Sequence, residues 1–136
     1  MGGQAAAVRE KQEQTRILIA EEKAAARRAL REYLQAQPGL DVVAEAADGG
    51  SLLEQTQVTC PDLILLEWDL PGQPKTDLFA SLRNLDCQPL VVVLGNRPES
   101  SSPATDAGAD AFVFKGHGPR KVLTTIRWLV LETGYA

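Results

Sequence analysis

The stretch that decides the fold is Pro61-Asp-Leu-Ile-Leu-Leu-Glu-Trp-Asp-Leu-Pro-Gly72. Four consecutive aliphatic residues stand between a Pro-Asp start and a Pro-Gly stop, a pattern typical of a strand buried on both faces of a parallel sheet. Glu67 lies at the carboxyl end of this strand. Open α/β sheets carry their functional groups at that edge, so Glu67 is the first candidate site residue.

Composition limits the classes of function. The chain has 136 residues, 44% of them hydrophobic and 24% charged, which fits one globular domain with its own core. Its net charge of −4 argues against direct binding to nucleic acid or to an anionic membrane surface. No apolar run approaches the roughly 20 residues of a membrane span, and the N-terminus lacks the apolar segment of a secretion signal. We predict a cytoplasmic protein.

The two cysteines give no sign of a metal or redox site from their spacing. Cys60 and Cys87 are far apart in the sequence and lie in no metal-ligand motif. We predict that both serve as small apolar residues at the starts of strands, in a reducing compartment.

Strand and helix patterns alternate along the chain. Aliphatic runs predict five strands, and apolar residues at helical spacing predict a helix after each. The second strand is the least apolar and is expected near an edge, while the all-aliphatic fourth is expected at the centre. The fold class is therefore α/β, a doubly wound five-stranded parallel sheet of the (βα)5 flavodoxin-like type. We assign residues 1–14 to a flexible N-terminal extension and residues 15–136 to the domain. The predicted strands cover residues 17–20, 40–46, 61–67, 89–94 and 109–115.

The carboxyl ends of the strands collect a set of polar residues. Because parallel strands end at one edge of the sheet, the residues that follow them are expected to lie close together. These residues are Glu21 and Glu22 after the first strand, Glu67 after the third, Gly95 after the fourth and Lys115 after the fifth.

This arrangement resembles the receiver domains of two-component response regulators. Ile17 to Glu22 is similar to the family's strand that ends in an acidic pair, Pro61 to Gly72 to its phosphoacceptor segment, and Phe112 to Lys115 to its conserved-lysine segment. Val42 to Gly49 and Ala107 to Ala109 resemble the subgroup that usually precedes a helix-turn-helix output domain. The resemblance covers roughly residues 16 to 132.

The resemblance implies a chemistry and also shows departures from it. In that family the acidic pair and an acceptor aspartate hold Mg²⁺, a histidine kinase supplies the phosphoryl group, and a Ser or Thr and the lysine bind its oxygens. Here Glu21, Glu22 and Glu67 stand at the aspartate positions, and Gly95 stands at the Ser/Thr position. Lys75 stands where a glycine usually follows the acceptor loop, whereas Lys115 and the aromatic switch residue, Phe112, are retained.

These departures predict that the phosphorylation pocket is degenerate. Each Asp-to-Glu change moves a carboxylate by about 1.5 Å, whereas catalytic geometry tolerates about 0.5 Å. We therefore expect no phosphorylation, no catalytic activity and no cofactor other than Mg²⁺, and a histidine kinase becomes a doubtful partner. Whether Glu21, Glu22 and Glu67 hold Mg²⁺ stays open. Two interpretations of Glu67 stay open. Either it pairs with Lys115 and holds the domain in an active-like state, or its pocket no longer has a role in signalling. Asp69 is a second candidate acceptor, although we expect it to face water.

The predicted function is that of an atypical receiver domain that works through protein–protein contacts. The expected surface is formed by the last two strands and helices, Arg97 to Leu131. The last helix carries more apolar residues, Trp128 among them, than are needed to cover its inner face. A protein partner or a second copy of the chain would bind there. The alternative is a working Mg²⁺-dependent phosphoacceptor that regulates a DNA-binding output domain missing from this chain. His117 has no partner for a metal site and is expected at the surface.

Overall fold

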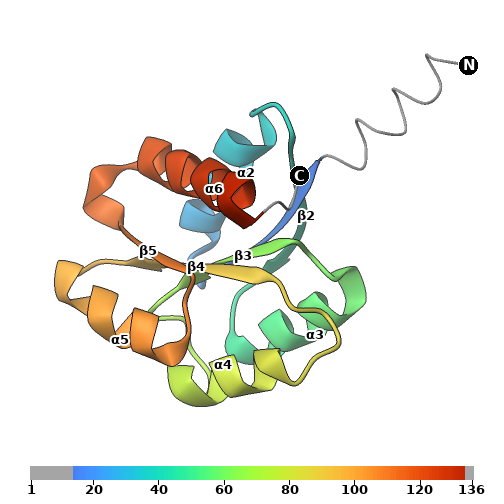
Figure 1. Ribbon diagram of the computed structural model, residues 1–136, viewed down its shortest axis with the longest axis vertical. Coiled ribbons are helices and arrows are strands. Elements are labelled where there is room, and N and C mark those ends of the chain that lie inside the picture. Colours follow the sequence, from blue (N-terminus) through green and yellow to red (C-terminus); the bar gives the residue numbers. More distant parts are fainter. Residues whose placement is uncertain (1–13, 134–136) are drawn as a thin grey trace, which may run out of the picture.

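The computed structural model describes residues 14–133, which form one parallel sheet with helices on both faces (Figure 1). The strand order is β2-β1-β3-β4-β5. The predicted N-terminal extension, apart from Gln14, lies outside the described residues. The strands are β1 (Thr15–Ala20), β2 (Leu40–Ala46), β3 (Leu63–Glu67), β4 (Leu90–Gly95) and β5 (Ala111–Phe114).

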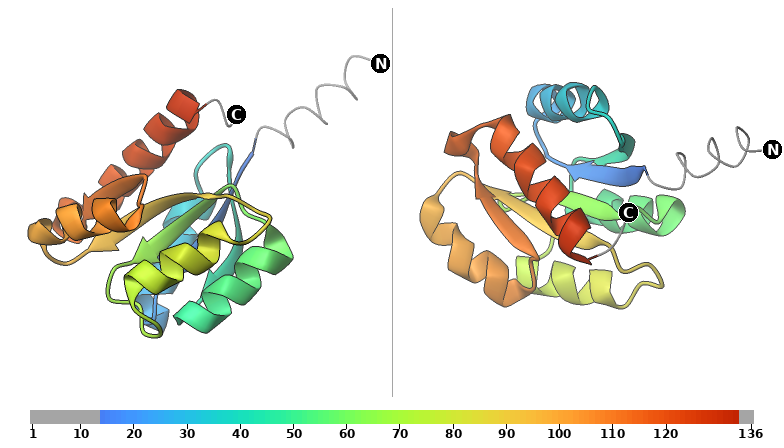
Figure 2. Two further views of the ribbon diagram at one scale, coloured as in Figure 1. Left: turned by 60° about the horizontal axis from the view of Figure 1, so that its bottom comes forward. Right: turned by 45° about the horizontal axis from the view of Figure 1, so that its top comes forward.

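The helices cover the sheet in two layers. Helices α2 and α6 lie on one face, and α3, α4 and α5 lie on the other (Figures 1 and 2). No helix within residues 14–133 is long and apolar enough to cross a membrane. The helices are α2 (Ala24–Gln35), α3 (Gly49–Thr59), α4 (Lys75–Arg83), α5 (Ser101–Ala107) and α6 (Pro119–Thr133), with short 3₁₀ turns η1 (Pro98–Ser100) and η2 (Lys115–His117).

The core is split by the sheet into two clusters because side chains alternate along each strand. In β3, Leu63 and Leu65 face α2 and α6, whereas Ile64 and Leu66 face α3, α4 and α5. All five residues of β3 are buried, and each aliphatic side chain buried in this way contributes about 2 kcal/mol of hydrophobic free energy. The prediction of a strand buried on both faces is confirmed.

Local sequence explains where the elements around β3 begin and end. Asp48 caps α3, since its carboxylate accepts a hydrogen bond from the Ser51 backbone N–H at 2.7 Å. The same hydrogen bond lowers the pKa of Asp48. After β3, Gly72 turns the chain with φ of +128°, and a Cβ there would lie 3.0 Å from the Gly49 nitrogen. A glycine is therefore required where the loop that follows Glu67 packs against the start of α3.

The predicted order of elements is confirmed, with small shifts at their ends. The bounds of β2 agree with the prediction, and its place at the sheet edge is confirmed. β4 is an interior strand, between β3 and β5, but the centre of the sheet is β3 and not the fourth strand. The fourth predicted helix is short and starts late, since the segment from Pro98 opens with a 3₁₀ turn and only seven α-helical residues follow.

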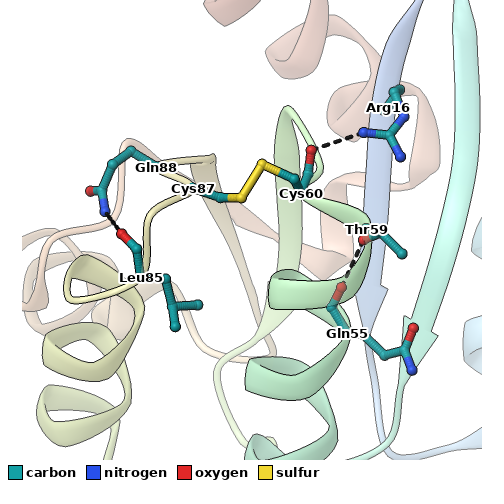
Figure 3. Close-up of a disulfide and its surroundings, with 7 residues drawn as sticks. All are labelled: Arg16, Gln55, Thr59, Cys60, Leu85, Cys87 and Gln88. Atoms are coloured by element: carbon teal, nitrogen blue, oxygen red, sulfur yellow. Dashed lines mark hydrogen bonds between the residues drawn. A yellow bond between two sulfur atoms is a disulfide. The ribbon is translucent and has the colours of Figure 1, made fainter.

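The prediction for the cysteines was wrong. Cys60 and Cys87 form a disulfide, with their Cα atoms 5.5 Å apart (Figure 3). The bond joins the loop before β3 to the loop before β4, at the amino edge of the sheet. The two cysteines are 27 residues apart in the sequence and come together only because β3 and β4 pair as neighbouring parallel strands. Their spacing alone therefore did not predict the disulfide.

Candidate functional site

The centre of the candidate site is the ammonium group of Lys115, which lies between two buried carboxylates. Its Nζ is 2.9 Å from Glu21 Oε1 and also forms an ion pair with Glu67 Oε2. Glu21 follows β1, Glu67 ends β3, and Lys115 follows β5. The pocket thus joins three strands at the carboxyl edge of the sheet, as the sequence predicts for these three residues.

Glu21 is held in place from its own loop. Its second oxygen accepts a hydrogen bond from the Lys23 backbone N–H at 3.1 Å. Its carbonyl oxygen accepts one from Arg27 Nη1 at 2.7 Å. Arg27 also forms an ion pair with Glu45 at 3.0 Å, which fixes the start of α2 against β2. These contacts orient the Glu21 carboxylate toward Lys115, and sequence reasoning did not identify Lys23 or Arg27 as supporting residues.

Glu67 is the least compensated of the three groups. The residue is 4% exposed, and its Oε1 has no hydrogen-bond partner of good geometry within residues 14–133. A buried carboxylate without a full set of partners is costly to ionise. The positive charge of Lys115 is therefore the main compensation for the negative charge of Glu67.

The titration behaviour of the pocket follows from this burial. Loss of hydration raises the pKa of Glu67, and the nearby Lys115 ammonium opposes that rise only in part. Burial alone would lower the pKa of Lys115, but its hydrogen bonds to Glu67 and Glu21 outweigh burial and raise it. Lys115 is thus stabilised as a cation, and burial disfavours the ionised form of Glu67.

Three other candidate residues have side chains exposed to solvent. Glu22 is exposed, and so are Asp69 and His117. Asp69 faces water as predicted, and His117 is the predicted surface residue, in edge-to-face contact with Phe114 at 5.3 Å. Within residues 14–133, no three His, Cys, Asp or Glu residues lie close enough to hold a metal ion.

Gly95 and Phe112 form a second contact at the same edge. A Cβ at position 95 would lie 2.6 Å from Cε2 of the Phe112 ring, which is closer than van der Waals contact permits. The ring therefore occupies the space that a side chain at position 95 would take. Any residue larger than glycine there requires the ring to move.

Lys75 borders the pocket from the start of α4. Its Nζ donates a hydrogen bond to the Leu70 carbonyl at 2.6 Å. Burial lowers the pKa of Lys75, and the charges of Asp69 and Glu67 oppose the change. This contact closes the turn that follows Glu67, a role that the sequence pattern alone did not predict.

Comparison with known families agrees with this geometry. Residues 17–127 match the sequence profile of the response regulator receiver domain. The chain belongs to this family. It is a receiver domain of two-component signalling, so the resemblance seen in the sequence is confirmed at the level of the family, and the fold agrees with it.

Individual relatives give the same result. The nitrate/nitrite response regulator protein NarP of Escherichia coli is 30% identical over 113 residues, which cover 82% of this chain and 53% of NarP. The chain thus spans about half the length of this curated relative. A LuxR-family response regulator from Aurantimonas sp. SI85-9A1 superimposes with a TM-score of 0.80 at 25% identity, covering 88% of this chain and 86% of that one. The response regulator domain of Thermotoga maritima CheB has the same fold, with a TM-score of 0.74 at 22% identity over 85% and 95% of the two chains.

Proposed function

We propose that this receiver domain signals through protein–protein contacts without being phosphorylated. The observation that carries the proposal is the position of Lys115 between Glu21 and Glu67. A lysine in a working receiver must be able to meet the oxygens of an incoming phosphoryl group. Here the Lys115 ammonium is already engaged by two buried carboxylates.

The ligand set also fits magnesium poorly. Mg²⁺ requires a near-octahedral shell of oxygen ligands at about 2.1 Å and is usually held by carboxylates with several waters. Only Glu21 and Glu67 converge on the pocket, since Glu22 is exposed. The Lys115 cation stands between those two carboxylates. We therefore infer that the three glutamates do not form a dedicated magnesium site.

The proposal assigns Glu67 an internal role in place of phosphate acceptance. Its ion pair with Lys115 links β3 to β5, and the Phe112 ring lies against Gly95 on the strand between them. The two contacts fix the carboxyl edge of the sheet in one arrangement. Signalling would then depend on which protein binds, because no phosphoryl group selects between states.

The surface proposed for these contacts lies on α5, β5 and α6. Trp128 is 58% exposed and Leu131 is 79% exposed, and a spacing of three residues places both on one side of α6. A hollow of about 500 Å³ between the start of α4 and helix α5 is lined by Trp68, Pro103 and Ala107 among others. Exposed apolar side chains on a single helix are typical of a face that meets another protein.

Phosphoryl binding can be tested by titrating Mg²⁺ and beryllofluoride, a phosphoryl mimic, while following Trp68 fluorescence. The titration is best made in a Trp128→Phe background, so that Trp68 is the only indole. We expect no saturable change in emission.

The alternative function gives a different result in the same experiment. A working phosphoacceptor would show saturable quenching that disappears in the Glu67→Ala variant, and that result would overturn the proposal. It would favour the alternative, a phosphoacceptor receiver that regulates a DNA-binding output domain.

The contact surface can be tested by sedimentation equilibrium over a range of protein concentrations. If α6 joins two copies of the chain, we expect a monomer–dimer equilibrium that the Trp128→Ser/Leu131→Ser variant shifts at least tenfold toward monomer. A Val58→Ser variant is the matched control, because Val58 is 73% exposed on α3, on the other face of the sheet. Equal dimerisation of all three proteins would show that α6 is not the contact.

A further inference from the structure

The disulfide lies at the end of the sheet opposite the Lys115 pocket. Cys60 follows α3 and precedes β3, and Cys87 lies between α4 and β4. These strands are the two that end in Glu67 and Gly95. Figure 3 shows the bond crossing directly between the two loops. No step of the proposed function uses this bond.

Hydrogen bonds hold the Cys60 loop in place independently of the sulfur–sulfur bond. The Cys60 N–H donates to the Thr56 carbonyl at 2.9 Å, and Arg16 Nη1 donates to the Cys60 carbonyl at 2.8 Å. Arg16 and Asp62 bind each other through two further hydrogen bonds of 2.9 Å each. The loop is therefore anchored to β1 even when the disulfide is open.

The Cys87 loop is held by local hydrogen bonds, within the loop and to the end of α4. The Gln88 side-chain amide donates to the carbonyls of Leu85 at 2.7 Å and Arg83 at 3.0 Å. The ladder between β3 and β4 begins at Leu63 and Leu90, each three residues after its cysteine. Two thiols released here would remain close together, and a high effective concentration favours closure of the bond again.

Both cysteine residues also lie at the protein surface. Cys60 is exposed, and Cys87 is partly exposed. Exposed disulfides with retained loop geometry are those that exchange with external thiols, whereas buried ones resist exchange.

We propose that Cys60 and Cys87 form a reversible redox modification site whose co-reactant is a dithiol. A thiolate of the dithiol attacks Cys60 Sγ, which forms a mixed disulfide and releases Cys87 as a thiolate that takes up a proton. The second thiol of the dithiol then attacks the mixed disulfide and releases Cys60. Two electrons and two protons pass to the protein, and the dithiol becomes a disulfide. The reverse reaction closes the bond again.

The experiment equilibrates the folded wild-type protein with graded mixtures of reduced and oxidised dithiothreitol, then quenches and alkylates it. Trypsin digestion without reductant should give peptide 32–75 linked to peptide 84–115 in the oxidised protein. In the reduced protein both peptides should carry one alkyl group. We expect complete conversion in both directions while the far-ultraviolet circular dichroism stays constant. Cys60→Ser and Cys87→Ser are controls that should each carry one alkyl group under every condition.

Three results would overturn the proposal. Reduction that occurs only in denaturant would show a bond that the native protein protects. Two alkylated thiols at every ratio, including the most oxidising, would show that the pair does not close. A linkage between two chains would show that the sulfur partners are intermolecular. Because the test uses the wild-type chain, it does not depend on the folding of a variant.

Discussion

Replacing Lys115 by methionine is expected to lower the free energy of unfolding by about 3 kcal/mol at neutral pH. The ammonium group of Lys115 is the counter-charge for both Glu21 and Glu67, which are each 4% exposed. Removing one member of a buried ion pair leaves an uncompensated charge, which typically costs about 3–5 kcal/mol. Methionine keeps most of the aliphatic volume, so the loss measures charge rather than packing. Urea denaturation of the two proteins measures the difference.

A second substitution isolates the part that Glu67 plays. Glu67→Gln removes the buried negative charge with little change in shape, and Lys115 keeps its contact with Glu21 at 2.9 Å. We expect Glu67→Gln/Lys115→Met to recover at least 1 kcal/mol of the loss, as double-mutant cycles find for groups in direct contact. If the two substitutions are additive, Glu67 and Lys115 do not interact, and the proposed internal role of Glu67 is wrong.

The pH dependence of the Lys115→Met deficit follows from the raised pKa of Glu67. A carboxyl group whose pKa is higher in the folded than in the unfolded protein destabilises the fold as the pH rises. The effect develops between the ordinary pKa of 4.5 and the pKa in the folded protein. Above the folded pKa the loss is complete, and below 4.5 it is absent. The deficit of Lys115→Met should therefore be largest at neutral pH and shrink as the pH falls toward 4. A deficit that does not change with pH would indicate lost packing instead of lost charge.

Replacing both cysteines by serine is expected to lower the free energy of unfolding by about 3.5 kcal/mol. The disulfide closes a loop with a sequence separation of 27. Closing a loop of this size restricts the unfolded chain by roughly that amount on the chain-entropy estimate. The melting temperature should fall by about 10 °C, given the usual relation between stability and melting temperature for domains of this size. Differential scanning calorimetry of the oxidised protein and the Cys60→Ser/Cys87→Ser variant measures the change.

Reduced wild-type protein is the matched control for the double variant. Both lack the cross-link, so they should melt together, well below the oxidised protein. Equal melting of all three proteins would show that the bond does not constrain the unfolded state. The loss is smaller than the stability of many domains of this size, which is why we expect reduced protein to stay folded.

The fold could be predicted from the sequence because each strand carries a strong signal. Leu63 to Leu66 and Leu90 to Leu94 are almost purely aliphatic, and only a strand covered on both faces requires such a run. Topology then places the residues after β1, β3 and β5 together, so Glu21, Glu67 and Lys115 were found from strand ends alone. What the sequence did not reveal was the direction of each side chain. Glu22 neighbours Glu21 in the chain but is exposed, because the chain bends there between β1 and α2.

The disulfide depends on where each cysteine stands relative to the strand that follows it. Cys60 and Cys87 each lie three residues before the start of a strand, and those two strands pair with Leu63 opposite Leu90. Equal offsets from neighbouring parallel strands bring two residues to the same place at the sheet edge. The predicted strands start at residues 61 and 89, so the equal offsets emerge only from the strand bounds and from the pairing of β3 with β4. The contact of Phe112 with Gly95 has no comparable signal, since it depends on the rotamer of one ring.

The Lys115 pocket also sets an order of events during synthesis of the chain. Glu21 and Lys115 are 94 residues apart, and β1, β2 and β3 leave the ribosome well before Lys115 does. Until then, pairing of β1 with β3 would bury two carboxylates without their cation, so early strand pairing is disfavoured at neutral pH. Lys115, which follows the last strand, thus supplies the positive charge that stabilises the pairing of β1 with β3. A nascent chain that stops short of Lys115 should therefore be less stable, and more open to chaperones and proteases, than one that contains it.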